Sequence, residues 1–434
     1  MIWQPKYETM DRAALEQLQL ERLQATLTRV SRNVPFYRMK FEEMGIDPDE
    51  FRSLEDVRRL PFTGKADLRD NYPYGMFAVP LREVVRLHAS SGTTGKPVVG
   101  GYTKNDIARW TELTARVLSA AGVTKDDVIQ ITLAYGLFTG GFGFHYGAEL
   151  IGASVIPSSS GNTRRQVAIM QDYKTTTLVS TPSYALYLAD TMDEMGVNAN
   201  ALGLKYALCG AEVWSEGMRR EIQDRLKVVA TDNYGISEVM GPGIAGECQE
   251  RAGLHLNEDH FLVEIINPET CAPAEPGQVG ELVLTTLTKE AFPLIRYRTG
   301  DLTRLLPGIC ACGRTFMRME RVLGRADDMF TVKGVNVFPS QVEAVLCSIK
   351  GLTPHYQIEL DREGPLDKAT VFVEADAELL VDRIREAQAV QETTRKRLFS
   401  ELGVHFEVKL MEGKTLTRFE GKARRVKDKR TFSA

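Results

Sequence analysis

The sequence predicts an α/β protein with a large multi-layer N-terminal domain, made of mostly parallel sheets with helices plus a small antiparallel barrel. A small α+β ferredoxin-like C-terminal domain follows. Three observations lead to this prediction. Strand and helix patterns alternate between residues 153 and 234, as in βαβ units. Antiparallel strand patterns follow at Phe261–Ile266, Gly280–Thr286 and Leu294–Arg298. A β-α-β-β-α-β order then runs from residue 329 to residue 410, which is the ferredoxin-like arrangement.

The length of 434 residues also requires more than one hydrophobic core. The run Gly324-Arg325-Ala326-Asp327-Asp328 interrupts the surrounding apolar patterns and indicates a hinge. We therefore expect an N-terminal domain over residues 1–324, a hinge at 325–328 and a mobile C-terminal domain over residues 329–434.

The N-terminal third opens with leucines at helical spacing over residues 10–34, and Pro35-Phe36-Tyr37 is expected to end that helix. After a strand at Val98–Tyr102, a helix is expected at Asn105–Ala121 and a buried strand at Val128–Leu133. The parallel unit then contains the strands Ala153–Ile156, Thr177–Ser180, Tyr206–Cys209 and Val228–Tyr234, and the helices Arg164–Tyr173, Pro182–Met195 and Ser215–Arg225.

The most informative stretch is Ser90-Ser91-Gly92-Thr93-Thr94-Gly95-Lys96-Pro97. Its glycines permit close approach to a ligand, its hydroxyls and backbone N–H groups are donors, and its one lysine suits phosphate. An ordinary surface turn is the alternative interpretation. The stretch is not a Walker loop, because only two residues separate the glycines and Pro97 follows the lysine. We expect the tip of a hairpin that covers phosphates.

A second glycine-rich segment, Ala134–Gly147, contains five aromatic rings and a histidine. Its spacing does not fit a dinucleotide fingerprint, because three residues separate Gly143 from Gly147 and no acidic residue follows at the expected distance. The composition favours an aromatic-walled pocket for a flat apolar ligand. Core aromatics beside a glycine-rich turn are the alternative.

Two strand ends of the parallel unit carry polar residues, at Gly210–Glu212 and at Asp232–Glu238. Ligands of such sheets bind beyond the carboxyl ends of the strands. Glu238 is a candidate Mg²⁺ ligand, since this cation on phosphates uses one or two carboxylates. Asp301, at the end of an antiparallel strand, could accept hydrogen bonds from ribose hydroxyls. The alternatives are that Glu238 is an ordinary surface glutamate and that Asp301 is an ordinary turn aspartate.

Four potential ligands of a soft metal stand in two pairs, Cys310 with Cys312, and Cys248 with His255. Three thiolates and one imidazole would close a tetrahedral structural zinc site. The Cys-x-Cys spacing is shorter than usual, and Cys271 and Cys347 are among the cysteines that the site would not use. The sequence is therefore compatible both with a structural zinc site and with free thiols.

In the C-terminal domain we expect the strands 329–337, 355–360, 369–374 and 404–410, and the helices 340–348 and 376–402. A capping box at Ser340–Glu343 supports the first helix start. Lys422 lies on a glycine-flexible segment, and the basic run Lys422–Arg430 is interpreted as a solvated end.

The composition excludes several classes of protein. A net charge of −4 gives no global basic field for nucleic acid or an anionic membrane. No stretch has the length of a membrane span, and the N-terminus lacks the apolar core of a signal peptide. Six cysteines in 434 residues are typical of a cytoplasmic protein with reduced thiols rather than a disulfide scaffold.

Taken together, the motifs resemble those of the acyl-adenylate-forming superfamily, and most closely its phenylacetate–coenzyme A ligases. The resemblance covers nearly the whole chain, and six motifs occur in the family's order. They are Ser90–Pro97, Tyr135–Gly147, Asp232–Glu238, Tyr297–Asp301, Gly324–Asp328 with Lys333–Pro339, and Glu420–Lys422.

This resemblance implies two half-reactions. A carboxylate attacks the α-phosphate of ATP to give an acyl-adenylate and pyrophosphate, and coenzyme A then displaces AMP after the small domain rotates. The family serves the breakdown of aromatic acids, and it implies a cytoplasmic homodimer. Bulk at Phe142 and Phe144 leaves open which aryl or arylacetic acid is used.

The resemblance also assigns roles to residues. ATP phosphates would bind Ser90, Ser91, Gly92, Thr93, Thr94, Gly95 and Lys96. Glu238 would bind Mg²⁺, Asp301 the ribose hydroxyls, and Arg325 would orient the nucleotide. The adenine side would be formed by Gly210, Ala211, Glu212, Asp232, Asn233, Tyr234 and Gly235.

The remaining roles concern the mobile domain and the acid. Lys422 would stabilise charge in adenylation, and Asp327 would be the hinge residue. Lys333, Gly334 and Asn336 would help form the thiol channel after rotation. The acid pocket would be lined by Tyr135, Phe138, Gly140, Phe142, His145 and Ile236.

Two other functions remain open on this sequence. The acyl group could pass to a carrier-protein thiol or an amine, which dependence on free coenzyme A would decide. The second alternative function is that of a regulator that binds a nucleotide without turnover. Such a regulator would be expected to lack Lys422 or Glu238, and both residues are present.

Overall fold

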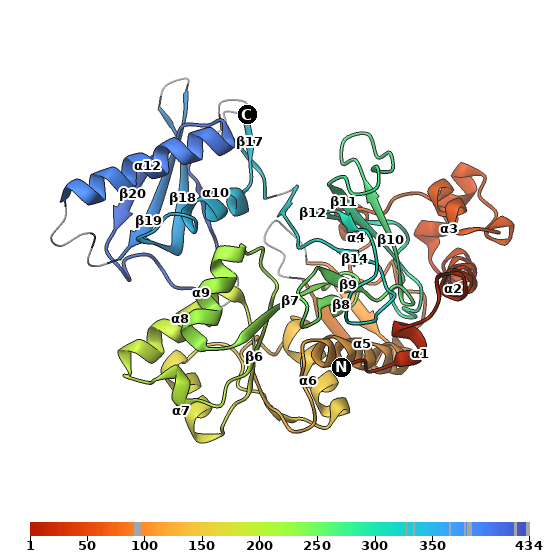
Figure 1. Cartoon of the computed structure of the whole chain (residues 1–434). Coiled ribbons are helices and arrows are strands. Elements are labelled where there is room, and N and C mark those ends of the chain that lie inside the picture. The colour runs from red at the N-terminus through yellow and green to blue at the C-terminus, as the bar shows by residue number, and fades with distance from the viewer. Residues whose placement is uncertain are drawn as a thin grey trace.

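The computed structural model describes residues 1–90, 97–326, 328–332, 335–363, 366–376, 379, 384–420 and 423–430. A large N-terminal part and a small C-terminal part are distinct in Figure 1, with the latter packed against the α8–α9 side of the former. No helix in the described ranges combines the length and the apolar character needed to cross a bilayer.

The N-terminal part is built around a nine-stranded sheet of order β13-β14-β9-β8-β7-β6-β5-β3-β4. Its strands are β3 Val128–Ile131, β4 Ser154–Ile156, β5 Thr177–Ser180, β6 Tyr206–Gly210, β7 Val229–Ile236, β8 Gly241–Glu247, β9 Leu254–Leu256, β13 Leu305–Leu306 and β14 Arg318–Met319. The strands from β3 to β7 pair in parallel, and those from β7 to β13 pair antiparallel. The predicted alternation of strand and helix is therefore confirmed. Its helices are α5 Lys104–Ala120, α6 Gly140–Ile151, α7 Thr163–Asp172, α8 Pro182–Glu194 and α9 Glu216–Leu226.

Helix α6 forms in a stretch whose glycines disfavour a helix in isolation. Close packing against α5 explains why the helix is stable here. A Cβ added to Gly143 would lie 2.6 Å from a Pro242 carbon and 2.7 Å from the Trp110 ring. Only glycine allows this contact, so tertiary packing outweighs intrinsic propensity.

The N-terminal segment is α-helical, with α1 Pro5–Glu8, α2 Arg12–Asn33, α3 Pro35–Met44 and α4 Lys65–Asp70, joined by the short 3₁₀ helices η1 Pro48–Glu50 and η2 Leu54–Arg59. The prediction that the first helix ends at Pro35–Tyr37 is confirmed, since α2 ends at Asn33, but Pro35 is also the first residue of a second helix, α3, which was not predicted. Proline is well suited to that position, where its missing N–H would have no helical partner. Figure 1 shows α2 and α3 at the edge farthest from the C-terminal part.

The strands β1 Arg86–Ala89 and β2 Val99–Tyr102 form an antiparallel pair, preceded by η3 Leu81–Glu83. This pair confirms the hairpin expected around the Ser90–Pro97 stretch. Ser90 and Val98 close its stem, since the Ser90 N–H donates to the Val98 carbonyl at 3.0 Å and the Val98 N–H to the Ser90 hydroxyl at 3.0 Å. Residues 91–96 lie outside the described ranges.

The predicted antiparallel unit is a four-stranded sheet of β10 Phe261–Ile266, β11 Gly280–Thr286, β12 Tyr297–Thr303 and β15 Gly324–Arg325. The strand predicted at Leu294–Arg298 is β12, which begins three residues later and ends five residues later than predicted. Asp301 therefore lies inside β12 rather than at a strand end, directly opposite Arg325 of β15.

The C-terminal part contains β16 Phe330–Val332, β17 Val335–Val337, α10 Pro339–Leu346, β18 Leu352–Glu363, β19 Leu366–Ala375, α12 Ile384–Leu402, β20 Glu407–Met411 and β21 Val426–Asp428. Its sheet has the order β20-β19-β18-β21. The prediction of one strand over residues 329–337 was wrong. In the structure β16 and β17 pair with each other as a separate hairpin.

The fourth place in this sheet is filled by β21, which pairs in parallel with β18. Interpreting Lys422–Arg430 as a solvated end was therefore also wrong. Two of the three β21 residues, Lys427 and Asp428, are charged and exposed, so the strand has no hydrophobic alternation to predict it. The backbone pairing with Ile358–Leu360 holds it in place.

Candidate functional site

The carboxyl ends of β6 and β7 lie side by side, as the parallel sheet requires. Gly210 is opposite Asn233, and a Cβ on Gly210 would lie 2.5 Å from the Asn233 carbonyl oxygen. The Asn233 amide donates to the Cys209 carbonyl at 2.6 Å. The structure thus brings together the two stretches expected on the adenine side, Gly210–Glu212 and Asp232–Gly235.

Glu212 connects this edge of the sheet to the C-terminal part. One carboxylate oxygen accepts a hydrogen bond from the Ser183 hydroxyl at 2.9 Å and another from the Ala423 backbone N–H. The Ser183 N–H, in the first turn of α8, donates to the other oxygen at 3.2 Å. Ala211 before it has a left-handed φ of 68°, which is uncommon for a residue with a side chain. The backbone is therefore held in an unusual conformation where it turns toward the small domain.

Asp232 is buried below this edge in a charged network. Arg219 binds Glu247 through two hydrogen bonds of 2.7 and 3.0 Å, and Glu247 also accepts from the Asp232 N–H at 2.7 Å. Burial, with the neighbouring Glu247 charge, raises the pKa of Asp232 to about 7. This pKa means that the Asp232 carboxyl is partly protonated near neutral pH.

Asp301 is the centre of a second polar group at the same end of the molecule. Its carboxylate accepts a hydrogen bond from the Tyr234 hydroxyl at 2.5 Å and one from Arg325 at 2.7 Å. Arg325 also donates to the Thr299 carbonyl at 3.3 Å. Asp301 and Tyr234 are buried, and burial together with the Asp301 charge raises the pKa of Tyr234 well above its usual value. Three residues predicted separately for the nucleotide site therefore form one hydrogen-bonded group.

Glu238 lies in the turn between β7 and β8, half-buried. In the described part of the chain its carboxylate has no hydrogen-bond or ion-pair partner. Beside it, Ser237 and Thr139 share a hydrogen bond of 3.0 Å, and the Tyr102 hydroxyl donates to the Met240 carbonyl at 2.9 Å. The turn thus lies against β2, the strand that leads away from the Ser90–Pro97 hairpin.

The predicted acid-pocket residues form an aromatic group only in part. The Tyr135 ring lies 5.2 Å from Phe142 and 5.8 Å from His145, and its hydroxyl lies 3.3 Å from His145 Nδ1. Gly140 is the first residue of α6, and Ile236 is the last residue of β7. Phe138 is 42% exposed. The tyrosine, phenylalanine and histidine are thus grouped, while no ring contact ties Phe138 to them among the described residues.

Sequence reasoning missed Arg86 in this group, and it placed Tyr146 only within the aromatic segment as a whole. The Arg86 guanidinium lies 4.7 Å from the Phe142 ring centroid and 5.1 Å from that of Tyr146, within cation–π range. Tyr146 belongs to the helix face of Phe142, one turn away, but Arg86 comes from β1. No local pattern in the sequence relates the two segments.

The hairpin stem and the aromatic segment are neighbours. The Ala89 N–H donates to the Leu137 carbonyl at 2.9 Å, and His88 Nδ1 lies 3.1 Å from the same oxygen. The expected phosphate-binding stretch therefore begins beside the expected acid pocket.

Several predicted site residues lie outside the described ranges: Ser91, Gly92, Thr93, Thr94, Gly95, Lys96, Asp327, Lys333, Gly334 and Lys422. Asn336 is described and lies in β17, where its side chain accepts from the Thr331 hydroxyl at 2.8 Å. Its role in a thiol channel stays a prediction.

The four predicted soft ligands come together. The ligand atoms of Cys248, His255, Cys310 and Cys312 all lie within 4.8 Å of one another. Cys248 Sγ is 3.7 Å from Cys310 Sγ, and Cys312 Sγ is 3.5 Å from His255 Nε2. A disulfide needs about 2.05 Å between sulfurs, so these thiols are not bonded.

The two parts of the chain meet through polar contacts besides that of Glu212. Arg418 donates to Asp190 at 3.1 Å, Lys414 pairs with Glu194 at 2.7 Å, and the Ser215 N–H donates to Glu343 at 2.8 Å. These contacts join the C-terminal part to α8 and to the residue before α9, and Figure 1 shows the C-terminal part beside these two helices.

This fold and this edge of the sheet define an AMP-binding enzyme. The sequence profile of the AMP-binding enzyme family matches residues 58–287, and that of the AMP-binding enzyme C-terminal domain matches residues 334–430. The chain is 49% identical to phenylacetate–coenzyme A ligase of Thermus thermophilus, over 99% of this chain and 100% of that one. It is 48% identical to the enzyme of the same name from Escherichia coli, over 100% and 99%. The chain belongs to the phenylacetate–coenzyme A ligase family of AMP-binding enzymes.

Solved structures agree with this assignment and also compare domain arrangements. 2-Hydroxyisobutyryl-CoA ligase in its postadenylation state, 29% identical, superposes with a TM-score of 0.92 over 98% of this chain and 92% of that one. The same ligase in its thioesterification state is 30% identical, and it superposes with a TM-score of 0.73 over 98% of this chain and 91% of that one. The arrangement of the present chain is therefore closer to the postadenylation state.

Proposed function

We propose that this protein joins phenylacetate, or a closely related aryl or arylacetic acid, to coenzyme A in an ATP-dependent, AMP-forming reaction. Near-half identity over the full length to phenylacetate–coenzyme A ligases carries the proposal. The hydrogen-bonded group of Asp301, Tyr234 and Arg325 at the carboxyl end of the sheet supports it, because ligands of such sheets bind there.

In the first half-reaction an oxygen of the acid's carboxylate attacks the α-phosphorus of ATP. A new P–O bond forms, the bond to the β-phosphate breaks, and pyrophosphate leaves. This step needs the neutralisation of charge and the alignment of two anions rather than a protein nucleophile. In the second half-reaction the coenzyme A sulfur attacks the acyl carbon and the bond to AMP breaks.

The residues at the site suit these requirements. The Asp301 carboxylate suits the hydroxyls of a nucleotide ribose, because a carboxylate accepts several hydrogen bonds, while Arg325 and Tyr234 fix its orientation. Glu238, half-buried and without a described partner, suits an Mg²⁺ ion that would neutralise phosphate charge. The aromatic group of Tyr135, Phe142 and His145 suits the ring of the acid.

The acid is tested by AMP release from ATP and coenzyme A with phenylacetate, indoleacetate, benzoate and a medium-chain fatty acid. We expect the highest kcat/KM with phenylacetate or another arylacetate. A preference for the fatty acid would contradict an aromatic pocket at Tyr135–Tyr146.

Asp301 gives a direct test of the nucleotide site. Asp301→Asn removes the charge that pairs with Arg325 and places an amide N–H₂ toward one of its two donors. We expect the KM for ATP to rise about tenfold or more, since a charge-assisted hydrogen bond contributes roughly 1.5–3 kcal/mol. Steady-state kinetics measure it. Asp328→Asn is the control, because Asp328 is half exposed and lies 3.8 Å from the same arginine; an equal effect of both changes would count against the assignment.

The small domain is in position for the first half-reaction on this proposal. Ala423 follows Lys422 in sequence, and its N–H donates to Glu212. The TM-scores of 0.92 and 0.73 support an arrangement near the adenylation geometry. Glu212 then holds the segment that carries the adenylation lysine.

Glu212→Gln is expected to lower adenylate formation about tenfold while thioester formation from supplied acyl-adenylate is unchanged, because the charged acceptor for Ala423 is needed in one arrangement only. Single-turnover assays of each half-reaction measure both. Glu216→Gln, an exposed change nearby in α9, should affect neither. Equal losses in both half-reactions would contradict a role specific to adenylation.

The cluster of three cysteines and one histidine is suited to bind a structural zinc ion. Its members are Cys248, His255, Cys310 and Cys312. Tetrahedral zinc with bonds of about 2.3 Å to sulfur and 2.05 Å to nitrogen places sulfurs about 3.8 Å apart, and sulfur about 3.5 Å from nitrogen. The separations of 3.7 and 3.5 Å fit these values. Burial and two nearby arginines lower the pKa of His255 to about 3, so its imidazole is neutral. Four protein ligands leave no open position, so the ion would stabilise the fold rather than take part in chemistry.

A cytoplasmic homodimer remains the family-based proposal for assembly and location. The six cysteines form no disulfide, which fits a reducing compartment.

A further inference from the structure

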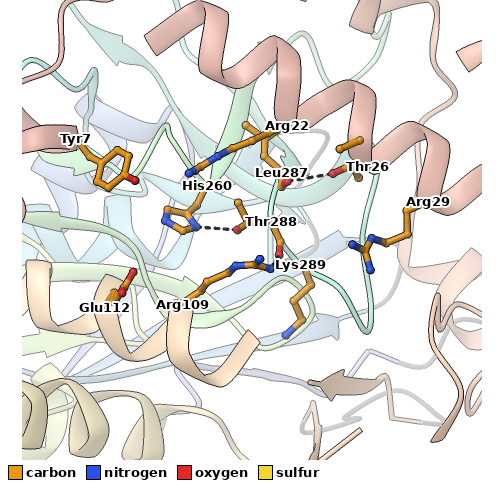
Figure 2. Close-up of a pocket in the computed structure, with 11 residues that line it drawn as sticks. Tyr7, Arg22, Thr26, Arg29, Arg109, Glu112, His260, Leu287, Thr288 and Lys289 are labelled. Atoms are coloured by element: carbon orange, nitrogen blue, oxygen red, sulfur yellow. Dashed lines mark hydrogen bonds between the residues drawn. The ribbon is translucent and has the colours of Figure 1, made fainter. Parts of the chain in front are cut away.

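A cavity of about 300 Å³ lies between α2 and α5, and none of its lining residues belongs to the nucleotide or acid sites above. It is lined by residues of α1, α2 and α5, by His260 before β10, and by the segment after β11. Figure 2 shows Arg22 and Arg29 along α2, with Arg109 of α5 and Lys289 of the segment after β11 across from them.

The positive charge of this lining is incompletely neutralised. Asp259, the carboxylate nearest to Arg22, already accepts two hydrogen bonds from Arg116 at 2.7 and 2.9 Å and lies 3.7 Å from the Arg22 nitrogen. Burial lowers the pKa of Arg22, whereas the charges of Asp259 and Tyr7 raise it by more than those of Arg116 and Arg109 lower it. Asp259 is thus shared between Arg22 and Arg116, so one carboxylate stands against two guanidinium groups.

Arg29 adds a cation without a counter-ion. It is half-buried, and within the described ranges its guanidinium has no hydrogen-bond or ion-pair partner. Arg109 pairs with Glu290 at 3.1 Å, and Glu112 is the only carboxylate among the residues that line the cavity. The cations of the lining thus outnumber its anions.

Lys289 forms the inner wall. Its ammonium group is buried 3.0 Å from the centroid of the Tyr102 ring. Burial lowers the pKa of Lys289 to about 7. A second negative charge near the cavity would favour its protonated form.

We propose that this cavity binds a phosphoryl anion. Guanidinium groups match phosphate oxygens with paired, charge-assisted hydrogen bonds, and a dianion or trianion suits several cations around a small volume. Inorganic phosphate, pyrophosphate and the 3′-phosphate of coenzyme A share this chemistry. Through Lys289 and Tyr102, whose hydroxyl donates to Met240, the cavity adjoins the turn that carries Glu238.

The test is isothermal titration of the full-length protein with inorganic phosphate, pyrophosphate and coenzyme A in separate experiments at constant ionic strength. The catalytic site is first filled with a non-reactive sulfamoyl analogue of phenylacetyl-adenylate. We expect at least one of the three ligands to bind at a saturable site that the cavity variants weaken, and that ligand identifies the source of the phosphoryl group. Binding that the cavity variants leave unchanged is assigned to the coenzyme A and pyrophosphate positions of the catalytic site, which the analogue does not fill.

Arg29→Gln is expected to weaken that binding at least tenfold, since it removes one charge-assisted contact. Arg32→Gln is the matched control, because Arg32 is exposed on the same helix and lies outside the cavity. Thermal unfolding checks that each variant is folded, and Arg22→Gln is a second cavity variant.

Three results would overturn the proposal: no saturable binding of any ligand, unchanged binding by both cavity variants, or equal weakening by Arg29→Gln and Arg32→Gln. The titration detects binding without turnover. Its failure is therefore distinct from failure of the proposed ligase activity, which is measured by AMP release.

Discussion

Lys422→Ala is expected to lower the rate of adenylate formation by about 10²–10³-fold, as the loss of one preorganised charge at a reacting centre does in other enzymes. The effect should be confined to the first half-reaction. The backbone N–H of Ala423, the next residue, donates a hydrogen bond to Glu212 at the carboxyl end of the sheet. Rotation of the small domain for the second half-reaction would break this hydrogen bond. Thioester formation from supplied phenylacetyl-adenylate and coenzyme A should stay within about twofold of wild type.

Lys427→Ala is the matched control for this change. Lys427 is exposed in β21 and comes from the same segment, so its loss removes one positive charge without touching the site. Rapid-quench measurement of each half-reaction separates the two steps. A Lys422→Ala protein that forms adenylate at the normal rate, or that loses both steps equally, would show that this lysine does not act in adenylation alone.

Cys310→Ser is expected to reduce bound zinc from one ion per chain to none and to lower the unfolding temperature by at least about 5 °C. The large effect follows because the free energy of binding to a structural zinc site is part of the folding free energy. The cluster joins Cys248, just after β8, to a loop more than fifty positions later in the chain. Arg314, next to this cluster, forms an ion pair with Glu8 at 2.6 Å. Metal analysis and thermal unfolding measure the two effects.

Cys271→Ser provides the comparison, since Cys271 is half-buried and outside the cluster. Its variant should keep both the zinc and the unfolding temperature. If wild-type protein supplied with zinc during expression carries none after purification, or if Cys310→Ser retains it, the four residues are free thiols and a histidine packed together.

Local patterns were sufficient to predict most of the elements. The alternation through β3–β7 and the hairpin of β1 and β2 were confirmed because hydrophobic period and turn residues encode them directly. Helix α6 was not predicted, since its glycines favour a turn until Trp110 and Pro242 are placed against them. Strand β21 was misinterpreted because backbone pairing, rather than side-chain pattern, determines it.

For the site, the residue types were predictable but their partners were not. Asp301 and Arg325 were each proposed from the sequence, yet only the pairing of β12 with β15 shows that they bind each other. Arg86 reaches the aromatic group from another segment, and a pairing between distant segments leaves no local signal. The four candidate zinc ligands were predicted as two pairs, and the fold brings their ligand atoms within 4.8 Å of one another.

The central claim is that the chain ligates phenylacetate to coenzyme A through an adenylate. The most direct test incubates the protein with ATP and phenylacetate, first without and then with coenzyme A, and follows phenylacetyl-adenylate, AMP and phenylacetyl-CoA by mass spectrometry. The account predicts enzyme-bound adenylate without coenzyme A, and catalytic release of AMP with stoichiometric phenylacetyl-CoA when it is added. Adenylate that forms but is never consumed by coenzyme A would contradict the claim and point to a carrier-protein thiol or an amine as acceptor.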